Sequence, residues 1–140
     1  MLPTLEVLRD SVLIDLWYRR GRGIKVGDII SFDTVYEPGG RSIKRVLGVE
    51  GDYVLRDTPN CEGDVMLQVS GQYSRGAVWT DLAQIPRGHC WVVGDNLPSS
   101  KDSRTLGPIP MAVIRGKVNF KVGPWKERKC LENSLNPVSQ

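Results

Sequence analysis

Apolar and polar residues alternate along several stretches of this chain, which is the pattern of β-strands that have one covered face. The clearest run is Val113 to Val122, where apolar side chains alternate with basic and amide side chains. A second run, Ile24 to Tyr36, places Ile30 and Phe32 on one face and Ser31 on the other. No segment with a helical period stands out. The pattern therefore predicts an all-β domain built mainly from antiparallel strands.

Turn-forming residues divide the rest of the chain into further short strands. We expect these strands at Val12–Tyr18, Ser42–Leu47, Tyr53–Arg56, Val65–Val69 and Cys90–Val93. Glu37 to Gly40 reads EPGG and predicts a turn, so Ser42–Leu47 should return antiparallel to the strand before it. From Lys126 onward the chain is polar and without pattern. We therefore expect one domain at residues 1–125 and a disordered tail at residues 126–140.

Composition narrows the class of protein. A chain of 140 residues is long enough for one domain with a modest core. Its net charge is +3 and its basic residues are scattered, which by itself does not indicate nucleic-acid binding. Cys61, Cys90 and Cys130 form no CxxC pair, so neither a disulfide framework nor a zinc site is predicted. The chain has no apolar run approaching the ~18 residues that a membrane-spanning helix needs.

One polar stretch stands apart from the strands: Gly94 to Gly107, with the sequence GDNLPSSKDSRTLG. It lies between the apolar run Cys90–Val93 and a turn bounded by Pro108 and Pro110. Turns are made of Gly, Asn, Asp, Pro and Ser, so a turn-rich surface loop is one interpretation. The other is the polar scaffold of a functional site, because hydrogen-bonding groups at this density need partners wherever they are buried.

Lys44 is the first candidate for chemistry. Neighbouring strand residues point to opposite faces, so either Lys44 or Arg45 faces the covered side of the sheet. Lys44 shares its face with Val46. Arg45 shares its own face with Ile43 and Leu47, so the pattern does not decide which of the two is inside. A desolvated lysine loses its proton more easily and can act as a general base, whereas a solvated strand lysine is the plainer interpretation.

Other reactive side chains are weaker candidates. His89 and Cys90 are adjacent in a predicted strand and should point apart, so we expect no thiol–imidazole pair and interpret Cys90 as a small core residue. The basic run RRGRG, Arg19 to Gly23, is interpreted as a flexible, solvent-facing loop. Five acidic residues beside turns show no metal-ligand spacing and are expected to be solvated: Asp15, Asp28, Asp33, Glu50 and Asp52.

Four motifs, taken in order, resemble those of type I signal peptidases. They are MLPTL (Met1–Leu5), GDIISF (Gly27–Phe32), IKRVLGVEGD (Ile43–Asp52) and GDNLPSSKDSRTLGPIP (Gly94–Pro110). Four matches in the same order, spread over most of the chain before the tail, are far more specific than any one of them. The compact size and the run from His89 through IRGKV to Trp125 look most like the organellar, mitochondrial inner-membrane branch of this family.

The resemblance implies a serine protease with a Ser–Lys dyad, built on an antiparallel, barrel-like catalytic domain, and needing no cofactor. Lys44 then matches the general base, and Ser100 matches the serine whose hydroxyl orients that lysine. The other implied assignments concern support and substrate binding: Asp102 and Arg104 as an ion pair that braces the loop, Asp95 and Asn96 as the residues that open it, and Ile43, Leu5 and Met1 as lining of the pocket for small substrate side chains.

The same resemblance places the nucleophilic serine directly before Met1, after a hydrophobic membrane anchor, and so outside this sequence. We expect the sequence to start at an internal methionine of a longer, active protein. By resemblance, that protein removes sorting presequences from precursors delivered to the intermembrane space, at the mitochondrial inner membrane. The resemblance implies a second, homologous protease subunit as its partner. It implies no nucleic-acid partner.

Three alternatives stay open at this point. The chain could be a catalytically dead homologue that binds presequences or stabilises a partner protease subunit. It could be a small basic β-barrel that binds RNA through RRGRG and exposed aromatic residues, with an affinity that falls steeply with salt. A bacterial signal peptidase would share the chemistry and differ in compartment.

Overall fold

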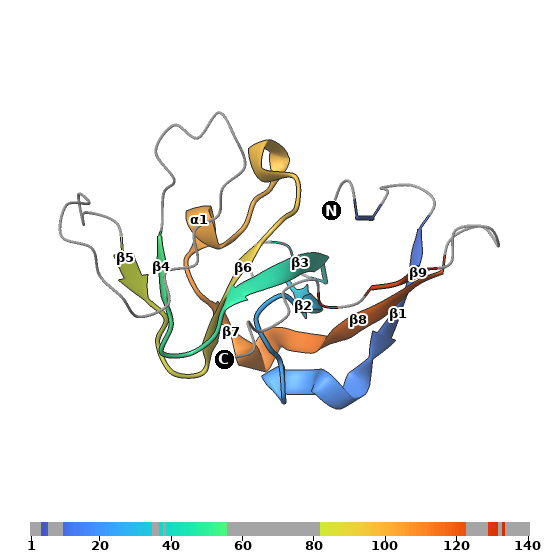
Figure 1. Cartoon of the computed structure of the whole chain (residues 1–140), viewed down its shortest axis with the longest axis horizontal. Helices are drawn as coiled ribbons and strands as arrows, with labels where there is room; N and C mark the ends of the chain where they lie inside the picture. Colours follow the sequence, from blue (N-terminus) through green and yellow to red (C-terminus); the bar gives the residue numbers. More distant parts are fainter. Residues whose placement is uncertain are drawn as a thin grey trace, which may run out of the picture.

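One antiparallel sheet makes up most of this computed structural model, which describes residues 4–5, 10–34, 37, 39–55, 82–122, 129–131 and 133 (Figure 1). The strand order is β1 (Ser11–Asp15), β8 (Ile114–Val122), β2 (Ile29–Asp33), β3 (Arg41–Gly48), β6 (His89–Val93) and β7 (Ile109–Pro110), and β9 (Lys129–Cys130) also pairs with β8. A separate pair joins β4 (Tyr53–Leu55) to β5 (Leu82–Gln84). All pairings of the described strands are antiparallel, which confirms the predicted fold class.

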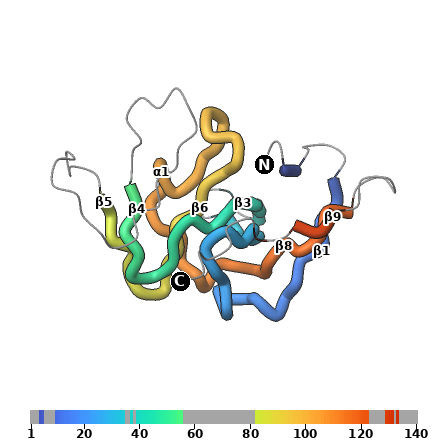
Figure 2. Tube along the Cα trace, viewed as in Figure 1, coloured from blue at the N-terminus to red at the C-terminus, as the bar shows by residue number. Residues whose placement is uncertain are grey.

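The two ends of the molecule are distinct in the chain trace. The β4–β5 pair lies at one side and β1, β8 and β9 lie at the other, with β3 and β6 between them (Figure 2). The predicted return of β3 against β2 is confirmed, with Ile30 opposite Lys44. The expected strand at Val65–Val69 falls outside the described residues. Within the part of the chain that the structure describes, no helix has the length and apolar character to cross a membrane.

The first strand is shorter than its sequence suggests. We expected a strand over Val12–Tyr18, but β1 ends at Asp15, whose carboxylate accepts a hydrogen bond of 2.9 Å from the Trp17 amide. That side chain caps the 3-10 helix η1 (Leu16–Gly21), which takes in part of the basic run predicted as a loop. Short helical turns also occur at η2 (Leu97–Ser99), α1 (Ser103–Leu106) and η3 (Met111–Val113), none of which shows a helical period in the sequence.

Strand β6 is covered on both faces, because its alternate residues belong to two hydrophobic clusters. Cys90 and Val92 pack in the larger cluster, whereas Trp91 and Val93 pack in the smaller one with Ile85. The larger cluster also contains buried residues of four other strands and of the loop before β2: Ile24, Ile30, Phe32, Val46, Ile109 and Ile114. Cys90 is fully buried, as expected for a small core residue. β6 is thus a fixed support for the loop that follows it.

The polar face of β8 pairs with acidic residues from two other segments, one at β1 and one just before β2. Lys117 Nζ lies 2.9 Å from an Asp28 carboxylate oxygen, and Lys121 Nζ lies 2.7 Å from Asp10. Between them, Asn119 donates to Asp15 at 3.3 Å. The expectation that Asp28 is solvated is wrong, since the residue is only 2% exposed. Burial of its charge is compensated by Lys117 and by further hydrogen bonds.

Part of the predicted tail is folded against the sheet. Lys129–Cys130 form β9, and the Leu131 amide donates to the Asn119 carbonyl at 2.8 Å. The amide group of Asn133 donates to the Val26 carbonyl at 2.7 Å and to Asp28 at 3.1 Å. Lys129–Cys130, Leu131 and Asn133 thus contact the sheet, and the predicted domain boundary at residue 125 stays a prediction. The rest of residues 126–140 lies outside the described chain.

Candidate active site

Lys44 and Ser100, which the sequence places 56 positions apart, are in direct contact. Lys44 lies in the middle of β3 and shares its face with Val46, a fully buried residue of the larger cluster. Its Nζ donates a hydrogen bond of 2.6 Å to Oγ of Ser100. The contact forms because β6 pairs with β3 and leads directly into the loop that carries Ser100. A covered amine beside a hydroxyl is the arrangement expected of a lysine general base.

The surroundings of Lys44 favour its neutral form. Burial lowers the pKa of Lys44 below its ordinary value, and this effect outweighs the nearby carboxylates of Asp102 and Asp95, which raise it. The positive charge of Arg104 lowers this pKa further. A larger fraction of Lys44 is therefore deprotonated near neutral pH than of a solvated lysine.

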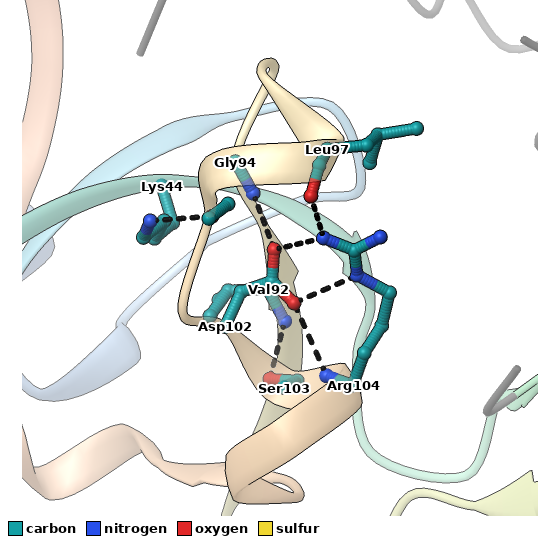
Figure 3. A network of polar contacts seen from close by, with 8 residues as sticks. Lys44, Val92, Gly94, Leu97, Asp102, Ser103 and Arg104 are labelled. Carbon is teal, nitrogen blue, oxygen red and sulfur yellow. Dashed lines mark hydrogen bonds and ion pairs between the residues drawn. The ribbon is translucent and has the colours of Figure 1, made fainter.

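Asp102 is the centre of the polar loop (Figure 3). Its carboxylate is buried and accepts hydrogen bonds from the Gly94 amide at 3.1 Å and from Arg104 Nε and Nη2 at 2.9 and 3.0 Å. Arg104 Nη2 also donates to the Leu97 carbonyl at 2.7 Å. Burial alone would raise the pKa of Asp102, but hydrogen bonds from Arg104, the Gly94 amide and Ser100 hold this pKa below its ordinary value. The predicted ion pair between Asp102 and Arg104 is present, and buried polar groups at Asp102 and Ser103 anchor the loop, whereas Pro98, Ser99 and Lys101 are exposed.

Two loop residues that we did not single out also hold the scaffold. The Ser103 hydroxyl accepts a hydrogen bond of 2.9 Å from the Val92 amide, which ties α1 to β6. Gly94 leaves the space in which Lys44 and Ser100 meet, because a Cβ there would lie 2.2 Å from Ser100 Oγ and 3.2 Å from Lys44 Nζ. The sequence shows Ser103 and Gly94 only as members of a polar run, without indicating what either would contact.

Arg45 points away from Lys44 but is also largely covered. Its Nε and Nη2 donate to the two oxygens of Asp95 at 2.9 and 3.1 Å, and its Nη1 donates to the Gly27 carbonyl at 3.1 Å. Asp95 accepts a further hydrogen bond from the Thr4 hydroxyl. The sequence pointed to Asp95 but gave no signal for Arg45 or Thr4, because their partners are distant along the chain. Asn96 contributes its carbonyl, which accepts from the Ser99 amide at 3.3 Å.

The predicted substrate pocket is only partly within the described chain. Leu5 is 6% exposed, and Ile43 is half-buried on the face of β3 opposite Lys44. Met1 lies outside the described residues. The assignment of these three residues to a pocket for small side chains stays a prediction.

Cys90 and His89, the other candidates named from the sequence, have separate surroundings. Burial raises the pKa of the Cys90 thiol to about 12, which keeps it protonated at neutral pH. His89 Nδ1 lies 2.9 Å from the Arg87 carbonyl. Among the described residues, no group of three or more His, Cys, Asp or Glu side chains comes together as a metal site would require.

Comparisons with known proteins bear on the family of the chain. Residues 1–125 match the family described as signal peptidase, peptidase S26. Mitochondrial inner membrane protease subunit 1 of Saccharomyces cerevisiae is 42% identical, over 89% of this chain and 66% of that protein. The Mus musculus protein of the same name is 35% identical, over 97% of this chain and 72% of its own. Mitochondrial inner membrane protease subunit 2 of Danio rerio is 29% identical, over 96% of this chain and 63% of its own. The chain thus spans about two thirds of the length of these relatives.

Proposed function

The chain belongs to the signal peptidase family, peptidase S26, and on that premise we propose that it is the catalytic domain of a serine endopeptidase with Lys44 as general base. The observation that carries the proposal is the 2.6 Å contact between Lys44 Nζ and Ser100 Oγ, at a lysine whose pKa is lowered by burial. A lysine of ordinary pKa, near 10.4, would be neutral in only about one molecule in several thousand at pH 7. Burial lowers the pKa of Lys44 and so raises the fraction of molecules in which this amine is neutral at pH 7.

The proposed nucleophile is the serine that the family resemblance places directly before Met1. Neutral Lys44 takes the hydroxyl proton as the serine oxygen attacks the scissile carbonyl carbon, and backbone N–H groups stabilise the oxyanion. The carbon–nitrogen bond then breaks, and the protonated lysine gives its proton to the leaving amine. Water, deprotonated in turn by Lys44, cleaves the acyl-enzyme ester and releases the new carboxyl group and the serine.

Ser100, Asp102 and Arg104 would hold Lys44 in the geometry for this transfer. The Asp102 carboxylate can only accept hydrogen bonds, so the Ser100 hydroxyl donates to it and its oxygen is left to accept from Lys44. Arg104 and the Gly94 amide fix the other side of Asp102. Because Asp102 is buried, this orientation is set by the fold and not by solvent.

The substrates and setting of the full-length protein are a further part of the proposal. We propose that the full-length protein removes presequences from precursors delivered to the mitochondrial intermembrane space, and that it is anchored in the inner membrane. Relatives that are named as subunit 1 and subunit 2 of the mitochondrial inner membrane protease support this compartment and a second, homologous subunit as partner.

The test is cleavage of a synthetic presequence peptide by the full-length protein that carries the expected serine. Lys44→Ala should reduce kcat by about 10²- to 10⁴-fold, the range supplied by a general base. Its thermal midpoint should not fall, because the change removes a desolvated amine. Lys101→Ala, at an exposed lysine of the same loop, is the control and should retain activity. Turnover by Lys44→Ala would rule out the dyad.

The competing interpretation is a non-catalytic homologue that binds presequences or stabilises its partner. It predicts that a protein with the serine in place cleaves no peptide, although it binds one. Intact-mass analysis of the native protein tests the same point: a chain that extends upstream through a serine directly before Met1 supports the protease, and a native amino terminus at Met1 supports the binding role.

A further inference from the structure

The Asp95 carboxylate connects three segments of the chain, those that carry Thr4, Arg45 and Asp95 itself. The proposed reaction depends on their relative positions. Both of its oxygens accept hydrogen bonds from Arg45, at 2.9 and 3.1 Å, and Oδ2 also accepts one from the Thr4 hydroxyl. The Arg45 and Asp95 side chains are 19% and 15% exposed, so the pair is mostly shielded from solvent. A bidentate, shielded pair of this kind has a fixed geometry.

Each of the three residues is close in sequence to a part of the proposed site. Arg45 follows Lys44 on β3, and Asp95 follows Gly94, which borders both Lys44 and Ser100. Thr4 precedes the buried Leu5 and lies four positions after the serine expected as nucleophile. At an extended rise of about 3.3 Å a residue, this distance spans about 13 Å at most. Fixing Thr4 therefore restricts where that serine can lie.

We propose that Thr4, Asp95 and Arg45 form a positioning clamp that sets the amino-terminal segment against Lys44. The proposal rests on the proposed function, because it concerns the approach of the expected serine to the Lys44 amine. Thr4 is a positioning residue here: its hydroxyl acts on the reaction through Asp95. A misplacement of about 1 Å at a reacting group can cost about 10²-fold in rate, so a single hydrogen bond at this point has a large effect.

The clamp predicts which kinetic constant changes. Loss of the Thr4 hydroxyl should lower the single-turnover rate of peptide cleavage, because fewer molecules hold the serine within reach of Lys44. Substrate binding and the protonation of Lys44 should change little, because Thr4 adds no charge near that amine. KM and the pH midpoint of kcat/KM should accordingly stay at their unsubstituted values.

The experiment compares two variants of the full-length protein with its expected serine. Thr4→Val has nearly the shape of threonine but lacks the hydroxyl, whereas Thr4→Ser keeps the hydroxyl. Thr4→Val should lower the single-turnover rate by about ten- to a hundredfold. Thr4→Ser should recover most of it. Thr34→Val removes a hydroxyl that donates to the Glu37 carbonyl in an exposed turn, and this control should leave the rate unchanged.

A double-mutant cycle separates the clamp from a general effect on folding. Asp95→Asn should lower the rate, and Thr4→Val added to Asp95→Asn should lower it little further, since the acceptor is already altered. Full activity of Thr4→Val would overturn the clamp, and so would equal losses in Thr4→Val and Thr4→Ser. Lys44→Ala distinguishes the two proposals: if it is inactive while Thr4→Val is fully active, the dyad stands and the clamp fails. If Lys44→Ala retains turnover, the proposed function fails.

Discussion

The Lys44 amine contacts the Ser100 hydroxyl at 2.6 Å, and backbone pairing on both sides of the contact fixes it. On one side, Lys44 is held in β3 between β2 and β6. On the other, Ser100 belongs to a loop that follows β6 directly and returns to it, because Ser103 accepts from the Val92 amide in β6 and Asp102 accepts from the Gly94 amide just after β6. The lysine and its partner are therefore positioned before any substrate binds, which is the condition for efficient proton transfer.

The first prediction concerns the Ser100 hydroxyl. Ser100→Ala removes the acceptor of the Lys44 hydrogen bond and leaves the amine free to take other rotamers, so kcat should fall by about ten- to a hundredfold. Ser99→Ala is the matched control, because this neighbouring serine is exposed, and its activity should be unchanged. Peptide cleavage under saturating substrate measures both. Equal activity in the two variants would contradict the orienting role of Ser100.

The second prediction concerns the space beside Lys44. Gly94→Ala places a methyl group where only 2.2 Å separates it from Ser100 Oγ, so Ser100 must shift away from Lys44. We expect kcat to fall at least about tenfold. Gly51→Ala is the control: Gly51 has open space around it, and its φ of +90° makes alanine strained there without crowding the site. Gly51→Ala should lower the thermal midpoint and leave kcat unchanged at temperatures below it.

The bounds of the strands could be predicted where local sequence pattern determines them. β3, β6 and β8 were expected within two residues of their observed bounds, because alternation and flanking turn residues are both local signals. β1 was predicted too long, since its apolar residues continue past Asp15. The end is set there by a side-chain cap, which competes with the strand for the same backbone.

The sequence pattern predicted the site less completely than it predicted the fold. Alternation assigns Lys44 and Arg45 to opposite faces but does not reveal which elements cover each face, and both proved to be covered. Lys44 was recognised through the family motifs and not through its spacing. Asp28 resembles an ordinary turn residue because its partner Lys117 is nearly ninety positions away, and only the pairing of β2 with β8 brings them together.

The third prediction compares two aspartates that pair with β8. Asp28 is 2% exposed and contacts Lys117 and Asn133, so Asp28→Ala leaves a covered lysine without its partner. The free energy of unfolding should fall by about 3 kcal/mol. Asp33, which pairs with Arg115 at the surface, is the control, and Asp33→Ala should have a much smaller effect. Urea denaturation measures both, and similar losses would contradict the structural role of Asp28.

The last prediction uses the charges around Lys44. Cleavage requires neutral Lys44, so kcat/KM should rise with pH and level off above the pKa of that amine in the free enzyme. Because the Asp102 carboxylate raises this pKa, Asp102→Asn should lower it and move the rise to lower pH. Because the Arg104 charge lowers the pKa, Arg104→Gln should move the rise to higher pH.

The opposite signs make this test specific. Both substitutions break the ion pair between Asp102 and Arg104 and should destabilise the fold by about 3–5 kcal/mol. A loss of folded protein would lower the activity of both variants at every pH. It would not move the two pH midpoints in opposite directions. Lys101→Gln removes a positive charge from the same loop at an exposed position and should leave the midpoint unchanged. Profiles that shift in the same direction for Asp102→Asn and Arg104→Gln would show that the titrating group is not Lys44.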